Sequence, residues 1–146
     1  MSNKRIMVVD DSRVVYAEMQ KMLKDSEVEI AAFCRTGEEA LERYEEVKPD
    51  VVTMDIVMSG MDGLETCQKL KERWPDACVL MVSSMAYTDM VDRAASMGAK
   101  GFLFKPFTQE SLLGGLRGVF KTLKGAEDEK ARTVFHLLLR FHHLYL

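Results

Sequence analysis

Five polar side chains lie at the ends of short apolar runs in the sequence, and their types suit phosphoryl chemistry. They are Asp10, Asp11, Asp55, Ser83 and Lys105. Three carboxylates that lie close together raise each other's pKa unless a cation sits among them. Carboxylate oxygens suit Mg2+, which keeps several waters and commonly binds one or two carboxylates plus a phosphate. An ionised Asp55 could then attack a phosphoryl group, with Lys105 neutralising the transferred oxygens and Ser83 donating a hydrogen bond to one of them.

Each of these residues also has an ordinary structural interpretation. An aspartate at a strand end often makes a turn or caps a helix, a serine there often makes a turn, and a lysine is usually a solvated charge. The prediction of a site therefore depends on whether the fold gathers the five residues at one place. Histidine takes no part in it, because residues 1–124 contain none and the three histidines are His136, His142 and His143.

Composition and charge predict one soluble domain with an ordinary core. The chain has 146 residues, of which 47% are apolar and 29% charged, as is typical of globular proteins. The net charge of -3 argues against a nucleic-acid-binding surface. The apolar run Ile6 to Val9 is too short for a signal peptide or a membrane span. Cys34, Cys67 and Cys78 are odd in number and form no C-x-x-C pair, so we expect reduced thiols in a cytoplasm, not metal ligands.

Apolar runs and helical patterns alternate along the chain five times. The expected strands are residues 6–9, 28–33, 51–55, 77–82 and 101–104. The expected helices begin at Asp11 or Ser12, at the capping-box pattern Thr36 to Glu39, at Gly63, near Tyr87 and at Thr108. This alternation predicts an α/β fold with five parallel strands in the flavodoxin-like order 2-1-3-4-5 and helices on both faces of the sheet. In that order, the ends of strands 1, 3, 4 and 5 bring the five polar residues into one crevice at the carboxyl edge of the sheet.

Five short motifs with this spacing resemble the receiver domain of a bacterial two-component response regulator. They are Val8-Val9-Asp10-Asp11-Ser12, Met54-Asp55, Met58 with Gly60-Met61-Asp62-Gly63, Met81-Val82-Ser83-Ser84 and Lys105-Pro106-Phe107. The layout is most similar to the single-domain, CheY-like chemotaxis type, and the resemblance covers residue 4 to about residue 124. Each motif alone is weak, and their combination with the strand and helix alternation is specific.

The resemblance implies a phosphoacceptor and its metal ligands. Asp55 matches the aspartate that takes a phosphoryl group from the phosphohistidine of a histidine kinase, and it also contacts Mg2+. Asp10 and Asp11 match the acidic pair that holds Mg2+, the second directly and the first usually through water. Val57 matches the position whose backbone carbonyl is a further protein ligand of the metal.

The resemblance also implies a switch. Ser83 matches the switch hydroxyl, Phe102 the switch aromatic, and Lys105 the phosphoryl-binding lysine, whose bond to Pro106 we expect to be cis. Phosphorylation adds roughly -1.5 to -2 charge, which Ser83 and Lys105 can follow. Their movement would bias the face formed by the fourth helix, fifth strand and fifth helix, about residues 87–124. For Phe102 alone, plain strand packing is the simpler interpretation.

Three positions depart from the family pattern. Ser59 replaces a proline that is usual in this loop, so we expect a less rigid loop and an intact fold. Val57 and Met85 occupy positions that often carry polar side chains, which tune hydrolysis of the phosphoryl group. Because two apolar residues would position no attacking water, we hypothesise a long-lived aspartyl phosphate.

Residues 125–146 do not fit the family, and we treat them as a C-terminal helical extension of a receiver domain at residues 1–124. The segment starts with Gly125 to Glu129, and its apolar and basic side chains then fall on different helical faces. It is too short for a DNA-binding output domain or a membrane span. It could dock on its own domain, pair with a second copy or bind a groove on a partner, and it could belong to a longer chain.

Three classes of function follow. The first is a stand-alone cytoplasmic receiver that catalyses only its own phosphorylation and dephosphorylation. Its expected partners are a sensor histidine kinase or phosphotransfer protein and a downstream protein, with no nucleic acid or membrane insertion; a homodimer through the face at residues 87–124 or through the extension stays open. The second is a magnesium phosphohydrolase, disfavoured because Val57 stands where its second carboxylate would be. The third is a module that only binds, against which the full set of five polar residues argues.

Overall fold

The computed structural model of the protein describes residues 4–84 and 88–123. Strands and helices alternate throughout this part of the chain. They are β1 (Lys4–Val9), α1 (Arg13–Leu23), β2 (Val28–Cys34), α2 (Gly37–Val47), β3 (Val51–Asp55), α3 (Gly63–Arg73), β4 (Val79–Ser83), α4 (Thr88–Ser96), β5 (Gly101–Phe104) and α5 (Gln109–Thr122). The predictions for residues 125–146 lie outside the described residues. None of the described helices is long and apolar enough to cross a membrane.

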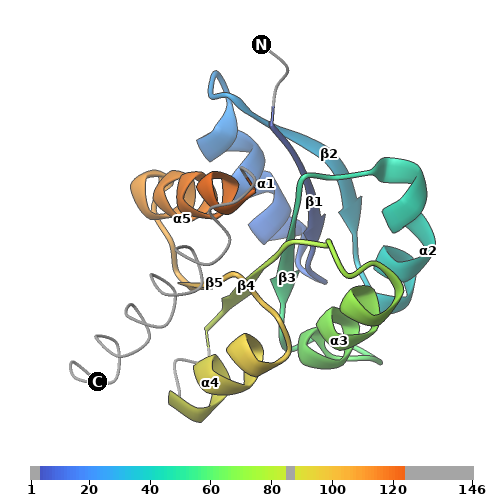
Figure 1. The fold of residues 1–146 in the computed structure, drawn as a ribbon. Coiled ribbons are helices and arrows are strands. Elements are labelled where there is room, and N and C mark those ends of the chain that lie inside the picture. Colours follow the sequence, from blue (N-terminus) through green and yellow to red (C-terminus); the bar gives the residue numbers. More distant parts are fainter. Residues whose placement is uncertain (1–3, 85–87, 124–146) are drawn as a thin grey trace.

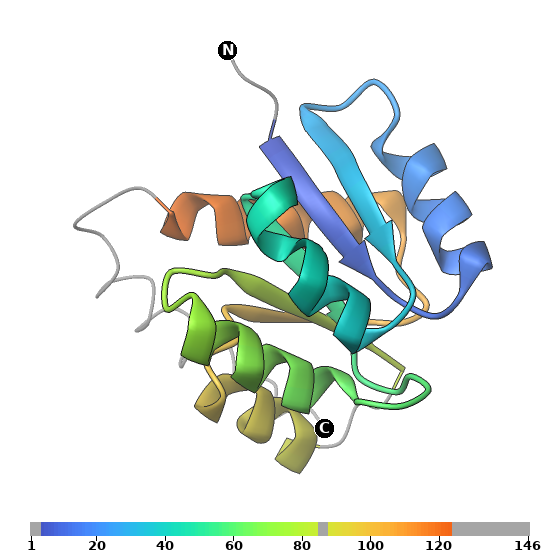
Figure 2. The same cartoon turned by 90° about the vertical axis from the view of Figure 1, so that its right-hand side faces the viewer.

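The strands form one parallel sheet in the order β2-β1-β3-β4-β5. The predicted α/β fold and strand order are therefore confirmed. Helices α1 and α5 cover one face of the sheet, and α2, α3 and α4 cover the other (Figures 1 and 2). Because both faces are covered, the central strands read as nearly continuous apolar runs.

Strand β3 lies at the centre, and all five of its residues are buried. Its side chains alternate between the two cores, as the pleat of a strand requires. Val52 and Met54 pack with the α2–α4 side, and Val51 packs with the α1–α5 side. The strand ends at Asp55, so the carboxylate stands where the apolar core stops.

The helices begin at predicted capping residues, but the capping box predicted for α2 is not closed. Ser12, rather than Asp11, caps α1 by accepting from the Val15 N–H. Thr36 caps α2 by accepting from the Glu39 N–H, but the Glu39 carboxylate accepts from the Arg35 N–H at 3.0 Å and does not close the predicted box. In α5 the box is complete, between Thr108 and Ser111.

The fourth strand is shifted from its predicted position. It covers residues 79–83 rather than 77–82, because the Ala77 N–H donates to the Trp74 carbonyl at 2.8 Å and continues the turn after α3. Ser83 is consequently the last residue of the strand and not part of the loop after it. Gly98, at φ +96°, follows α4 as predicted for a glycine at a helix end.

Candidate functional site

The three predicted carboxylates meet at the carboxyl edge of β1 and β3. These strands are neighbours, and Val9 pairs with Met54, so Asp10 and Asp55 follow in register. One carboxylate oxygen each from Asp10, Asp11 and Asp55 lies within 4.8 Å of the others. Asp10 is 2% exposed and Asp55 6% exposed, whereas Asp11 is half-buried.

Lys105 reaches the same cluster from the end of β5. Its Nζ lies 2.8 Å from Asp10 Oδ2 and 3.4 Å from Asp55 Oδ1. Its backbone N–H donates to the Ser83 carbonyl at 2.9 Å, and its peptide bond to Pro106 is cis, as predicted. Burial alone lowers the pKa of Lys105, but the hydrogen bond and charge of Asp10, together with Asp55, raise it above its ordinary value. The side chain is therefore a firmly held ammonium.

One ammonium does not balance the three carboxylates. Burial, followed by the charge of Asp10, raises the pKa of Asp55 from 3.8 to about 6, and Lys105 opposes this only in part. Such a site favours a further cation. The donor set fits Mg2+, because it consists of hard carboxylate oxygens at close range.

The oxygens of Asp10 are already engaged within the protein. Oδ1 accepts from the Ser12 N–H at 2.9 Å, and Oδ2 accepts from Lys105. Asp11 and Asp55 are less constrained in this way. More oxygen lone pairs therefore stay available on Asp11 and Asp55 than on Asp10, and the ligand role of each stays a prediction.

Ser83 and Phe102 lie in neighbouring strands, Ser83 as the last residue of β4 and Phe102 within β5. Ser83 is 1% exposed and follows Val82, the register partner of Asp55. Phe102 pairs with Met81 and is half-buried. Its ring packs against the core on the α2–α4 side and lies 5.1 Å from the ring of Phe104. This packing accommodates Phe102 as a strand residue, and its switch role stays a prediction.

The loop between β3 and α3 directly follows Asp55. Val57 is 60% exposed, and Met85, the other apolar departure, lies outside the described residues. The Glu38 carboxylate accepts from the Met61 N–H at 3.3 Å. The loop that lacks the usual proline at Ser59 is thus tied to the start of α2.

Gly63 sets how closely α3 approaches the acidic cluster. Its N–H donates to the Ile56 carbonyl at 2.8 Å. A Cβ at this position would overlap the carbonyl oxygen of Asp55. Only glycine lets the helix start so close to the backbone of Asp55.

Sequence reasoning missed two residues at the rim of the site, Glu38 and Arg35. The Arg35 Nη2 donates to the Asp11 carbonyl at 3.2 Å. The available signal was its position directly after β2, whose last carbonyl, on Cys34, accepts from the Asp10 N–H at 3.0 Å. Long side chains that reach from one loop to another leave no periodic pattern in the sequence. A position directly after β2 was therefore not enough to identify Arg35 as a residue of the rim.

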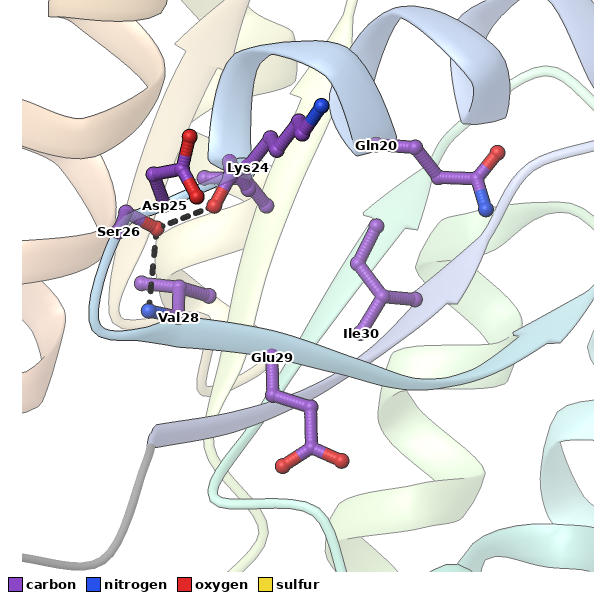
Figure 3. Close-up of a pocket in the computed structure, with 8 residues that line it drawn as sticks. Gln20, Lys24, Asp25, Ser26, Val28, Glu29 and Ile30 are labelled. Carbon is purple, nitrogen blue, oxygen red and sulfur yellow. Dashed lines mark hydrogen bonds between the residues drawn. The ribbon is translucent and has the colours of Figure 1, made fainter.

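A hollow of about 380 Å³ lies away from the acidic cluster (Figure 3). It lies between the end of α1 and the start of β2, at the opposite end of the sheet. Its lining residues are Gln20, Leu23, Lys24, Asp25, Ser26, Val28, Glu29 and Ile30. The lining mixes apolar side chains with both signs of charge and shares no residue with the predicted site.

Comparison with known proteins gives one consistent result. Residues 6–117 match the response regulator receiver domain. The chain is 39% identical over 117 residues to chemotaxis protein CheY of Listeria monocytogenes, covering 80% of this chain and 98% of that protein. It is 35% identical over 118 residues to chemotaxis protein CheY of Thermotoga maritima, covering 81% and 98%.

Solved structures give the same result for the fold. A chain of the CheX-CheY-BeF3-Mg2+ complex from Borrelia burgdorferi superposes with a TM-score of 0.76 at 29% identity, covering 80% of this chain and 88% of that one. The response regulator domain of CheB from Thermotoga maritima superposes with a TM-score of 0.74 at 28% identity, covering 82% and 97%.

Proposed function

The chain belongs to the response regulator receiver domain family, and on that premise we propose that it accepts a phosphoryl group on Asp55 and thereby changes which protein it binds. It acts in two-component signalling as a receiver of the CheY-like type. The observation that carries the proposal is the cluster of Asp10, Asp11 and Asp55 around the ammonium of Lys105.

The residues take complementary parts in the transfer. Asp55 supplies the nucleophilic oxygen, because its carboxylate stands at the end of β3 and its ionised form is the reactive one. Lys105 already lies 3.4 Å from Asp55 and stabilises the charge of the transferred oxygens. Asp10 holds Lys105 in place at 2.8 Å. In phosphoryl transfer, such positioning and charge stabilisation supply most of the catalysis.

Mg2+ is the cofactor that the donor set suits, with Asp10, Asp11, Asp55 and the backbone carbonyl of Val57 as its ligands. When bound, it would neutralise charge on the phosphoryl group and orient it. The matched Borrelia burgdorferi complex, which contains CheY, BeF3 and Mg2+, supports this assignment.

The switch acts through Ser83, Phe102 and the α4-β5-α5 face. Ser83 is the buried last residue of β4, and its carbonyl accepts from the Lys105 backbone N–H. A shift of either residue toward a new phosphoryl group is therefore passed to the other. We place the output surface on α4, β5 and α5, because both residues adjoin β5.

The partners follow from this chemistry. A sensor histidine kinase or phosphotransfer protein in the cytoplasm supplies the phosphoryl group, and a downstream protein reads the switched face. The second protein in the Borrelia burgdorferi complex, CheX, supports a role in protein binding. Homodimerisation through the α4-β5-α5 face or through residues 125–146 is a further arrangement that solution measurements would identify.

A magnesium phosphohydrolase is the alternative that shares this acidic cluster. Such an enzyme needs a carboxylate two residues after the nucleophile as acid and base. That residue is Val57, whose exposed side chain has no proton to exchange. The site supports one phosphoryl adduct rather than repeated turnover.

Intact-mass measurement after incubation with acetyl phosphate and Mg2+ tests the proposal. We expect one phosphoryl adduct, absent in Asp55→Asn and in a sample treated with a chelator. Steady release of phosphate over many turnovers would support the hydrolase instead. Neither adduct nor turnover would indicate a module that only binds.

A further inference from the structure

We propose that Arg35 is a phosphodonor-binding residue, whose guanidinium supplies the positive charge that receives an anionic phosphoryl donor at the rim of the acidic cluster. This inference rests on the proposed function. It concerns the approach of the donor and not the residues that react.

Two hydrogen bonds hold Arg35 at the rim, one from its side chain and one from its backbone. Its Nη2 donates to the Asp11 carbonyl at 3.2 Å, across 24 residues of sequence. Its own N–H donates to the Glu39 carboxylate at 3.0 Å. The preceding carbonyl, on Cys34, accepts from the Asp10 N–H. The end of β2 is therefore joined to both residues of the acidic pair.

The guanidinium is exposed and forms no ion pair within residues 4–84 and 88–123. The nearby carboxylate of Glu39 is instead paired with Arg43, whose Nη1 lies 3.6 Å from Glu39 Oε1. One weak hydrogen bond to a carbonyl leaves most of the donors of Arg35 available. A planar guanidinium with free donors matches the oxygens of a phosphoryl group.

The charge of the site explains why such a residue is useful. Among the residues that the structure describes, Lys105 is the cation that pairs with this cluster, where it contacts Asp10 and Asp55. Lys105 and a bound Mg2+ would together balance the three carboxylates inside the cluster, so an anionic donor that approaches from outside gains from a further cation at the rim. Arg35 is an exposed cation at this rim, because its guanidinium contacts the backbone carbonyl of Asp11.

In the transfer itself, Arg35 exchanges no proton. With acetyl phosphate, the bond between phosphorus and the acyl oxygen breaks, and its electron pair leaves with acetate. A carboxylate oxygen of Asp55 forms the new bond to phosphorus. Arg35 contacts the non-bridging oxygens of the donor before and during this exchange.

The test compares the rate of adduct formation from acetyl phosphate in Arg35→Gln, Arg35→Lys and the wild type, with Mg2+ present. We expect Arg35→Gln to lower the rate per donor concentration about fivefold, because one charge beside the site is lost. Arg35→Lys keeps the charge and should retain most of the rate. The control is Arg73→Gln, which removes an exposed arginine at the far end of α3.

Two further measurements separate donor binding from a structural role. Raising the salt concentration should shrink the difference between Arg35→Gln and the wild type, since exposed charges are screened. The Mg2+ affinity, measured by calorimetry, should stay the same or rise, because a nearby cation has been removed. Weaker Mg2+ binding in Arg35→Gln would show that Arg35 only positions Asp11, and would overturn the inference.

Equal rates for Arg35→Gln and Arg73→Gln would also overturn it. Absence of any adduct on the wild type would instead contradict the proposed function. The two failures are thus distinguishable.

Discussion

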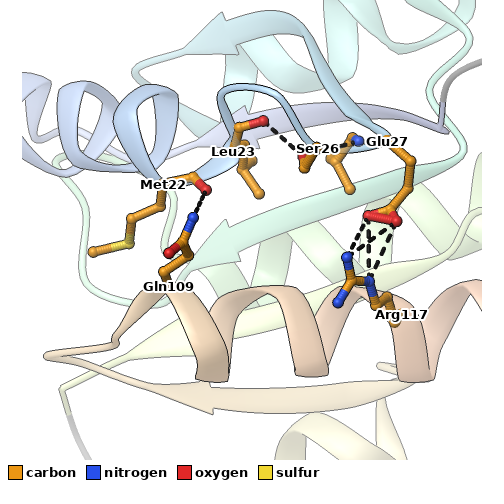
Figure 4. A network of polar contacts seen from close by, with 7 residues as sticks. Met22, Leu23, Ser26, Glu27, Gln109 and Arg117 are labelled. Carbon is orange, nitrogen blue, oxygen red and sulfur yellow. Dashed lines mark hydrogen bonds and ion pairs between the residues drawn. The ribbon is translucent and has the colours of Figure 1, made fainter.

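The two ends of the sheet each hold an ion pair, and the pairs differ in burial. At the carboxyl end, Lys105 contacts Asp10 at 2.8 Å, with side chains 18% and 2% exposed. At the opposite end, Arg117 of α5 forks onto Glu27 before β2 at 3.0–3.3 Å, with side chains 54% and 45% exposed (Figure 4). At the start of α5, Gln109 donates to the Met22 carbonyl at 3.0 Å and joins α5 to α1.

The two ends have opposite effects on their carboxylates. The hydrogen bond from Arg117 lowers the pKa of Glu27, and together with the charge of Arg117 it outweighs the opposing effect of burial. Burial and the charge of Asp10 raise the pKa of Asp55 to about 6, even though Lys105 lies beside it. Contact with a cation therefore does not by itself determine the pKa of a carboxylate. The burial of the carboxylate and the number of carboxylates around it also matter. They distinguish the exposed pair of Arg117 and Glu27, which joins two surface segments, from the buried cluster around Lys105.

The largest effect is expected from Lys105→Met, which removes the cation from the buried end. Loss of this charge should slow phosphorylation by acetyl phosphate in the presence of Mg2+ at least about 100-fold. It should also cost about 3 kcal/mol of unfolding free energy at neutral pH, because Asp10 and Asp55 lose their partner. Rates from intact mass and urea unfolding curves measure the two effects.

Lys69→Met is the matched control, because Lys69 pairs with Glu65 at 3.8 Å with both side chains largely exposed. It should change the stability by less than about 0.5 kcal/mol. Equal losses in Lys69→Met and Lys105→Met would contradict the role of burial.

Gly63→Ala tests the close approach of α3 to the acidic end. The added methyl would overlap the Asp55 carbonyl, so we expect a loss of about 3 kcal/mol in urea unfolding. Gly114 lies on the exposed side of α5, and the methyl added in Gly114→Ala would have no neighbouring atom within 4 Å. That variant should gain up to about 1 kcal/mol. A Gly63→Ala protein as stable as the wild type would show that the loop between β3 and α3 can move to accommodate the methyl.

The pH dependence of stability isolates the charge of Asp55 in protein kept free of metal by a chelator. Its native pKa of about 6 lies above the ordinary 3.8, so folding takes up a proton between these values. Asp55 should therefore destabilise the fold as the pH rises from about 4 to 6, by at most about 3 kcal/mol above that range. Asp55→Asn should unfold at higher urea than the wild type at pH 7.5, and the gap should close at pH 4. A gap that does not vary with pH would contradict this account.

Val57→Asn tests the loop that follows Asp55 at the acidic end. Val57 is 60% exposed, so the substitution should leave the fold unchanged. An amide there could position a water near the phosphoryl group, and we expect the adduct to decay about tenfold faster. The readout is the adduct half-life, with Val57→Ala as an apolar control. A short half-life in the wild type would refute the hypothesis of a long-lived phosphoryl group.

The smallest effect is expected at the exposed end. Arg117→Gln should cost less than about 1 kcal/mol, because an exposed pair gains little in water. A double-mutant cycle with Glu27→Gln in urea measures the coupling, which should fall with added salt. A coupling that is large and insensitive to salt would remove the distinction between the two ends.

Much of the fold and of the candidate site could be predicted from local patterns. Apolar runs ending in Asp10 and Asp55 indicated the strands, and the βα alternation left few strand orders. The contacts of Arg35 and Glu38 could not be predicted, because they join loops that are far apart in sequence. The start of β4 was wrong by two residues because the turn after Trp74 extends to Ala77.

The sequence by itself determined where strands and helices alternate along the chain and which side chains stand at the strand ends, since both follow from periodicity and residue chemistry. Only the tertiary structure decided how deeply Asp55 is buried, which oxygens of Asp10 are occupied and where Arg35 lies. These features arise from packing between segments distant in sequence. Burial and the distances between charges set the electrostatics of the site, and neither is encoded in any single stretch of the chain.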